Sequence, residues 1–295
     1  MATARLRQIR RRIRSVQSTR KITRAMELIA ASRIMKAQSR VEAARPYVEE
    51  LTKVVRDLAA QTGGAQHPLL EEREVSKAGI VVVTSDRGLA GAYSSNVLKV
   101  LEGAIIREGG LGKVRLYAIG RKGISYSRYR AYPLAFELTG VTDQPGYDSA
   151  KEVAEAVVTD YLAGEIDVVH VIYTEFYNLG VQRAEEFQLL PIPKHELEGG
   201  EEFQGEFIFE PSAERILESL LPRYVEGRAF AALLESSASE HAARRRAMKA
   251  ATDNAEELLK TLERIEARER QADITTEILE VVGGAEALRE LASTE

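Results

Sequence analysis

Hydrophobic residues recur at alternating intervals of three and four along the start of the chain. Counted from Leu6 to Leu58, this rhythm gives sixteen positions, of which thirteen carry apolar side chains. A repeat of about 3.5 residues is typical of the buried seam of a coiled coil. The stretch has no glycine before Gly63 and a single proline, Pro46. The pattern therefore predicts one long helix, with a kink where the proline removes a backbone donor.

Three consecutive positions of this seam carry polar side chains, namely Arg20, Thr23 and Glu27. In the same stretch the apolar residues lie on another face of the helix, at Ile22, Met26 and Ile29. We expect the helix to move its apolar face there and to change what it packs against.

The last third of the chain repeats the helical pattern. Residues 223–282 contain no proline and a single glycine, Gly227, and nine of the 23 residues from 229 to 251 are alanine. Small side chains let two helices approach closely. Because the chain leaves one predicted helix and enters the other through the same middle segment, we expect the two to pair antiparallel. The predicted second seam is Met248, Ala251, Ala255, Leu258, Leu262 and Ile265, resumed by Ile274, Ile278 and Val281.

Between the two predicted helices the hydrophobic period changes to that of strands. Strand-like apolar runs alternate with helical stretches near 92–108, 121–130 and 147–163. This alternation predicts an α/β domain, Rossmann-like, with a mostly parallel sheet. We expect an N-terminal coiled-coil helix over 1–58, a linker over 59–74, the α/β domain over 75–195, a linker over 196–211 and a C-terminal coiled-coil helix over 212–295. The predicted strands are 80–84, 114–119, 168–173 and 187–192.

Charge is distributed unevenly over the 295 residues. The formal net charge is −4, but residues 1–58 contain 15 Lys and Arg against 5 Asp and Glu, so they carry +10 and the remainder carries −14. The absence of cysteine excludes disulfides, thiolate nucleophiles and Cys-ligated metal sites. No apolar run approaches the roughly 18 residues that cross a bilayer, and we expect no secretion signal.

The segment 84–96, TSDRGLAGAYSSN, is the sharpest candidate for chemistry because it joins a strand to a helix through glycines. It has neither the lysine of a phosphate loop nor the three spaced glycines of a dinucleotide site, so a structural turn is favoured over nucleotide binding. Ser18 and Lys21 have a nucleophile–base spacing, but coincidence is the better interpretation on a basic helix. The four histidines are too scattered for the spacing of metal ligands: His67, His170, His195 and His241. The sequence therefore predicts no catalytic, cofactor or metal site.

The basic front of the chain leaves two interpretations open. Nine of the first 26 residues are basic and none is acidic, as in a nucleic-acid-binding surface. However, no aromatic residue precedes Tyr47, so nothing there can stack on bases. The other interpretation is a protein partner that presents negative charge.

Three segments carry a family resemblance: KITRAMELIAASRIMKAQ at 21–38, ASEHAARRRAMKAATDNAEEL at 238–258 and RQADITTEILEVVGGAEAL at 270–288. Together with the segment 84–96, they resemble the gamma subunit of the F-type ATP synthase, and the resemblance extends over essentially the whole chain. Departures from the usual pattern occur at Ser94, Ala267 and Glu269.

The resemblance implies a central rotary shaft and not an enzyme, because the nucleotide sites of such a complex belong to other subunits. The implied partners are the alpha and beta subunits, the epsilon subunit and the membrane rotor (c) ring. It implies no cofactor and no nucleic acid, and membrane association through partners only. The expected location is the cytoplasmic face of a bacterial plasma membrane. The alternative is a coiled-coil arm on an α/β head that binds nucleic acid or a scaffold partner.

The resemblance also implies which residues form contacts that transmit torque to the catalytic subunits. Their expected partners are acidic or backbone groups on mobile loops of the beta subunits. Gly283 and Gly284 resemble the start of the shaft's tip, which turns in an apolar bearing. The implied contact residues are Lys21, Met26, Glu240, Arg244, Arg270, Gln271 and Thr275.

Overall fold

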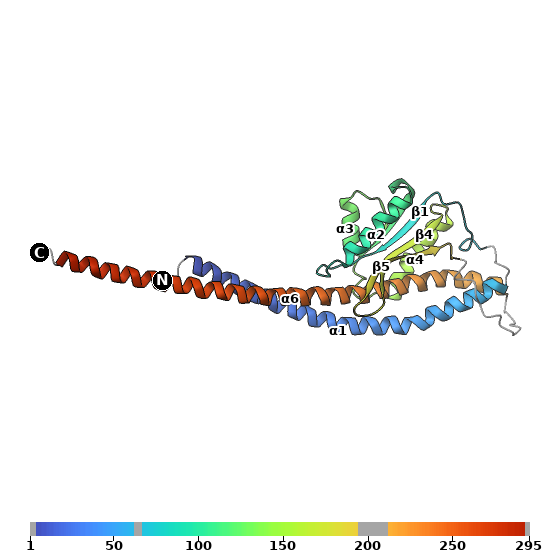
Figure 1. Ribbon diagram of the computed structural model, residues 1–295. Helices are drawn as coiled ribbons and strands as arrows, with labels where there is room; N and C mark the ends of the chain where they lie inside the picture. Colours follow the sequence, from blue (N-terminus) through green and yellow to red (C-terminus); the bar gives the residue numbers. More distant parts are fainter. Residues whose placement is uncertain (1–3, 62–66, 194–211, 293–295) are drawn as a thin grey trace. The chain divides into compact units, whose positions relative to one another are not determined.

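The computed structural model describes residues 4–61, 67–193 and 212–292 (Figure 1). The chain divides into two compact units, one of residues 1–29 with 247–295 and the other of residues 30–246. Two long helices, α1 (Ala4–Gln61) and α6 (Ala213–Ala292), belong partly to each unit. They confirm the prediction of a long helix at each end of the chain.

In the first unit, α1 and α6 pair antiparallel. Ile13 of α1 packs with Leu259 and Leu262 of α6. Ion pairs on either side follow the same order, since Arg5 contacts Glu269 at 3.1 Å, Arg10 contacts Glu266 at 2.7 Å and Arg20 contacts Glu256 at 3.9 Å. Residue numbers fall on one helix as they rise on the other, so the predicted antiparallel coiled coil is confirmed.

The seam of α1 does not move to another face, which corrects one expectation. All sixteen positions from Leu6 to Leu58 are buried or half-buried, and Thr23 and Glu27 are each only 8% exposed. Thr23 stays in the seam because the Thr252 hydroxyl donates a hydrogen bond to its Oγ1 at 2.8 Å. Ile22 and Ile29 are more than half exposed, at 58% and 53%. The helix therefore keeps one buried seam and adds a second, exposed apolar face.

The seam of α6 also differs from the prediction. Leu259 is buried at 4% exposure, whereas Leu258 and Ile265 are each 37% exposed. The residues predicted to resume the seam are exposed as well, namely Ile274, Ile278 and Val281. Steps of four and three from Met248 reach 252, 255, 259 and 262, so Thr252 and Leu259 take the buried places. The sequence left the register ambiguous because Leu258 and Leu259 are adjacent, and because the buried position 252 carries a polar threonine in place of an apolar residue.

The second unit is built around a five-stranded sheet in the order β3-β2-β1-β4-β5. The first four strands are parallel, and β5 pairs antiparallel with β4. This confirms a mostly parallel sheet. The predicted strands missed β3, a strand of only five residues at the sheet edge, in which half-buried positions alternate with exposed ones. The strands are β1 (Ala78–Val83), β2 (Val114–Ile119), β3 (Leu134–Leu138), β4 (Val168–Phe176) and β5 (Gln182–Leu190).

Helices cover both faces of this sheet. Ile80 and Val82 face α2 (Tyr93–Arg107) and α3 (Arg121–Tyr129), and a 3-10 turn, η1 (Leu111–Lys113), precedes β2. Val81 and Val83 face α4 (Tyr147–Leu162) together with parts of α1 and α6. The long helices thus complete the second hydrophobic layer of the α/β domain, because their residues 51–58 and 217–233 share its core.

Parts of the expected linkers, 62–66 and 196–211, lie outside the described residues, as does His195. Among the described residues, none of the helices combines the length and apolar character that a bilayer crossing requires.

Candidate functional site

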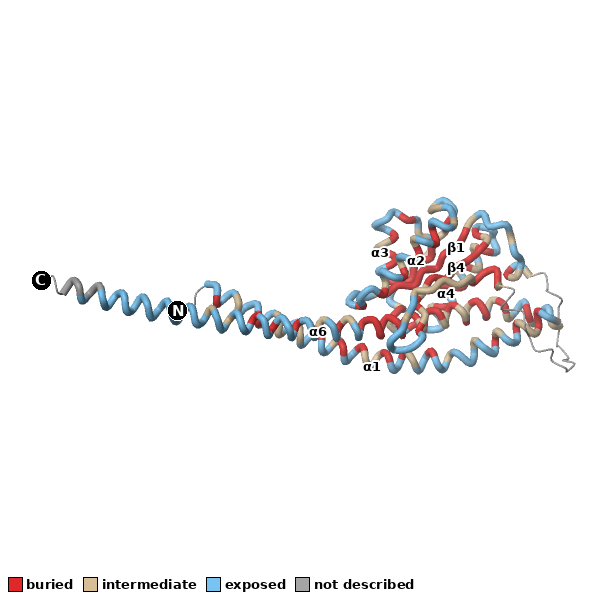
Figure 2. The backbone as a smooth tube through the Cα atoms, in the orientation of Figure 1, coloured by how far each residue is buried: buried red, intermediate tan, exposed pale blue. Residues whose placement is uncertain are grey.

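The C-terminal end of α6 presents a long exposed surface. Arg270, Gln271 and Thr275 are all exposed, and the Thr275 hydroxyl bonds only back to the Gln271 carbonyl at 2.9 Å, as threonines in helices do. Figure 2 shows this end of α6 as an almost uninterrupted exposed run. Its large apolar side chains are exposed as well: Ile274, Ile278, Leu279, Val281 and Val282. Apolar groups in such number on a helix surface mark a contact with another molecule.

A second exposed surface lies on α1. Lys21 is exposed and Met26 is half-buried, beside the exposed apolar residues Ile22, Leu28 and Ile29. Because Thr23 pairs with Thr252, this surface lies level with the part of α6 that precedes Arg270 by about 18 residues. At 1.5 Å per residue the two surfaces are roughly 27 Å apart along the helix. The structure therefore separates the expected contact residues into distinct groups.

The third expected group, Glu240 and Arg244, is buried inside the second unit. Arg244 Nη2 donates to Glu240 Oε1 at 2.5 Å, one helical turn away. The same nitrogen lies 3.4 Å from the carbonyl oxygens of Arg87 and Gly88, in the loop after β1. Burial raises the pKa of Glu240, and the Arg244 charge opposes that rise. Both side chains have partners within the chain, which nothing in the sequence motif indicated.

The loop after β1 is held by Asp86. Its carboxylate accepts hydrogen bonds from the backbone N–H groups of Arg121 at 3.2 Å, Gly140 at 2.8 Å and Thr142 at 3.2 Å. Burial alone would raise the pKa of Asp86, but these donors lower it below its ordinary value. In nucleotide-binding α/β domains, donors at this edge of the sheet hold phosphate. Here they hold a side chain of the same chain, so segment 84–96 is a structural turn.

The ends of β1 and β2 also approach too closely for a ligand to lie between them. Gly123 N donates to Thr84 Oγ1 at 2.7 Å, and that hydroxyl donates to the Ile119 carbonyl at 3.0 Å. Gly120 has a φ of +90°, and a Cβ atom there would lie 2.2 Å from the Thr84 carbonyl oxygen. The glycine is required because two strand ends touch.

The remaining candidates for a metal or catalytic site are the histidines and the pair Ser18 and Lys21. Within the described ranges, no group of three or more His, Asp or Glu side chains is placed to hold a metal ion. His170 lies 3.2 Å from Glu186, and burial lowers its pKa. Ser18 and Lys21 are both exposed on α1.

The basic front of α1 is partly neutralised within the coiled coil. Among the described residues, glutamates of the first unit contact several of these cations, namely Arg5, Arg10, Arg20 and Arg24. The basic residues at the front of α1 therefore stabilise helix pairing as well as forming an outer surface. This weakens the interpretation that they bind nucleic acid.

Comparisons with known proteins agree with this geometry. The model of the ATP synthase family matches residues 5–288. A protein from Parafrankia sp. named ATP synthase gamma chain is 53% identical over 296 residues, covering 96% of this chain and 97% of that protein. Proteins of the same name from Frankia casuarinae and Thermobifida fusca are 53% and 49% identical, and each alignment covers at least 96% of both chains.

Solved structures show the same fold. A chain of the Tetrahymena thermophila mitochondrial ATP synthase, from its central stalk and c-ring, matches with a TM-score of 0.61 and 25% identity. The match covers 78% of this chain and 99% of that one. A rotor chain of the Euglena gracilis mitochondrial ATP synthase matches with a TM-score of 0.67 and 15% identity, covering 91% and 98%. The 295-residue chain therefore belongs to the ATP synthase gamma chain family.

Proposed function

We propose that the chain is the central rotary shaft of an F-type ATP synthase, a non-catalytic subunit that couples ion flow to ATP synthesis or hydrolysis. Its proposed partners are the alpha and beta subunits around the coiled coil, and the epsilon subunit and c-ring at the α/β domain. The observation that supports this most directly is the C-terminal end of α6, where polar and apolar side chains lie exposed together over more than 20 residues.

The mechanism follows from asymmetry. A pair of helices has no threefold symmetry, so inside a ring of three catalytic subunits it touches each of them differently. A contact can bias a site only by the difference in its free energy between that site's conformations. Rotation exchanges which site receives which contact. Exposed polar pairs of about 0–1 kcal/mol each suit such contacts, because they must break and form again at every step.

The proposed contact residues fall into two exposed surfaces and one internal pair. Arg270, Gln271 and Thr275 form the C-terminal surface, and Lys21 and Met26 lie on the α1 surface. Glu240 and Arg244 are bonded to each other, and Arg244 also to the loop after β1. They contact another subunit only if these internal contacts open. The proposed boundaries remain a helix over 1–58, linkers over 59–74 and 196–211, the α/β domain over 75–195, and a helix over 212–295.

The chain belongs at a membrane as a peripheral protein, held through its partners. We place it at the cytoplasmic face of a bacterial plasma membrane, in agreement with its bacterial relatives.

The contact surface is tested by Arg270→Ala combined with Gln271→Ala in the assembled complex. Two lost polar contacts predict a fall in ATP turnover of about threefold to tenfold, because 1.4 kcal/mol corresponds to a factor of ten. The measurement is the steady-state ATPase rate of purified complex at equal gamma content. A matched control, Asn96→Ala with Lys99→Ala, removes an amide and a cation from the exposed face of α2. Full turnover in the first variant would remove both residues from the contact surface.

A further inference from the structure

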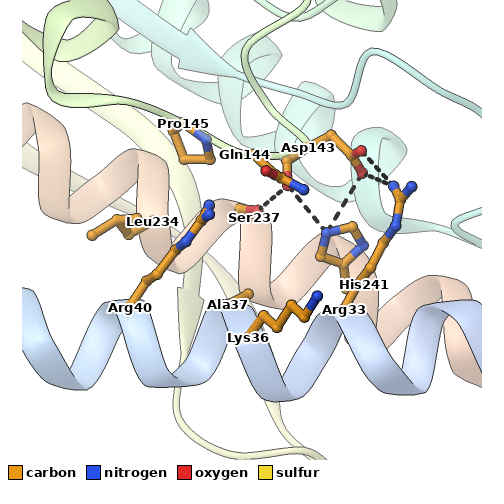
Figure 3. Close-up of a pocket in the computed structure, with 10 residues that line it drawn as sticks. All are labelled: Arg33, Lys36, Ala37, Arg40, Asp143, Gln144, Pro145, Leu234, Ser237 and His241. Atoms are coloured by element: carbon orange, nitrogen blue, oxygen red, sulfur yellow. Dashed lines mark hydrogen bonds and ion pairs between the residues drawn. The ribbon is translucent and has the colours of Figure 1, made fainter.

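Asp143 of the α/β domain contacts both long helices. It lies in the loop between β3 and α4 and lines a pocket with α1 and α6 (Figure 3). Arg33 Nη1 of α1 donates to both carboxylate oxygens, at 2.5 Å from Oδ1. From α6, the Ser237 hydroxyl donates to the Asp143 carbonyl at 3.1 Å, and His241 Nε2 lies 3.3 Å from the same oxygen. One residue of the domain therefore joins three elements.

His241 extends this contact along α6. Burial lowers its pKa, so the imidazole is neutral at pH 7, and Asp143 opposes the shift only in part. His241 Nδ1 lies 3.4 Å from Nη1 of Arg244. Because arginine only donates, Nδ1 accepts this bond and Nε2 carries the proton that is donated to the Asp143 carbonyl. A continuous network of hydrogen bonds therefore runs in the order Glu240, Arg244, His241, Asp143 and Arg33.

The network includes two loops at the carboxyl edge of the sheet. Arg244 reaches the carbonyl oxygens of Arg87 and Gly88 in the loop after β1. Asp86 bonds that loop to Gly140 and Thr142, just before Asp143. In other open α/β sheets this edge binds a ligand. In this chain it binds the two long helices.

Apolar packing alone would hold these elements less firmly in register. The same region of α1 and α6 packs through residues such as Ile34, Ala37, Leu234 and Ala238. Such contacts are non-directional, so neighbouring registers differ little in energy. Directional polar groups at a helix interface select one register, as a single buried asparagine does in coiled coils.

We propose that Asp143 is a torque-bearing positioning residue, which fixes α1, α6 and the α/β domain in one register so that rotation of the domain reaches the helices without slip. The inference rests on the proposed shaft function. It differs from a purely structural role in one respect, since it requires that loss of the ion pair lowers coupling more than it lowers catalysis.

The test replaces the carboxylate while keeping its shape, with Asp143→Asn in the membrane-bound complex. The measured quantity is the ratio of ATP-driven ion pumping to ATP hydrolysis, in inverted vesicles, as a transmembrane gradient builds up. We expect hydrolysis within twofold of the unaltered complex and a pumping ratio reduced at least threefold under that load. Asp148→Asn, an exposed carboxylate at the start of α4, is the matched control and should leave the ratio unchanged.

The double variant Arg33→Asp with Asp143→Arg restores the ion pair in the opposite sense and should recover most of the ratio. An unchanged ratio in Asp143→Asn would overturn the proposal, as would a double variant that assembles and hydrolyses ATP but stays uncoupled. Reduced thermal stability with normal coupling would mean that Asp143 is structural only. Failure of the shaft function itself gives a different result, because the unaltered chain would then not co-purify with ATPase activity.

Discussion

The carboxylate of Asp86 lies at the edge of the sheet where nucleotide-binding α/β domains hold a phosphate group. Three backbone N–H groups from two loops point at its carboxylate, so removing the side chain takes a charged acceptor from donors that are exposed or only partly buried. We expect Asp86→Ala to lower the free energy of unfolding of the second unit by about 1–2 kcal/mol at pH 7, because water can replace part of what the carboxylate provides. All 11 tyrosines lie between residues 47 and 224, so tyrosine fluorescence during denaturant unfolding reports on this unit alone.

The effect of Asp86 should also depend on pH. Its pKa is lowered in the folded state, so its stabilisation is fully present above the unfolded pKa of about 3.9 and is lost as the pH falls through the folded value. The difference between the unaltered chain and Asp86→Ala should therefore shrink below about pH 4. Asp148→Asn serves as the control. A difference that stays constant from pH 7 to pH 3 would mean that the charge of Asp86 does not hold the loops.

Single residues were the hardest level to predict from sequence. Segment 84–96 could be recognised as a turn, since the glycines and lysine of a phosphate site are missing. The residues that its Asp86 bonds lie more than 30 positions away, so the sequence did not reveal them. Arg33, Asp143 and His241 carry no local motif, and only the fold brings them together. Glu240 and Arg244 were expected at a subunit contact, and their burial depends on the position of the loop after β1.

At the level of elements, a regular heptad rhythm gave the best predictions. The seam of α1 holds at every position, including the polar ones, because Thr23 finds a partner in Thr252. The strands β1, β2 and β4 were found through their apolar runs, since strands buried on both faces contain few polar residues. Strand β3 was missed because it is short and lies at the sheet edge.

The register of α6 can be tested with two adjacent leucines. Leu259 is 4% exposed and packs in the seam, whereas Leu258 is 37% exposed. Leu259→Ala should lower the stability of the coiled coil by about 2–4 kcal/mol, and Leu258→Ala by less than about 1 kcal/mol. Hydrogen exchange of residues 247–268 in the full chain measures both. Equal effects, or a larger effect at Leu258, would contradict the register.

At the level of the whole chain, the net charge of −4 is the sum of a positive N-terminal segment and a negative remainder. The positive N-terminal segment neutralises glutamates of α6 and leaves other cations exposed towards a partner. The α/β domain binds the long helices with the edge that other domains use for ligands. Sequence patterns predicted the two helices and the domain, but not which edge of the sheet they meet, because that contact depends on side chains from four separate segments.

A central shaft must turn inside its complex and carry torque. The most direct measurement attaches a probe to the exposed face of α2, through a single cysteine introduced at Lys99, since the chain has no cysteine of its own. The complex with alpha and beta subunits is fixed to a surface and given ATP. We expect rotation in one direction with three pauses per turn. ATP hydrolysis at a normal rate with a stationary probe would contradict it.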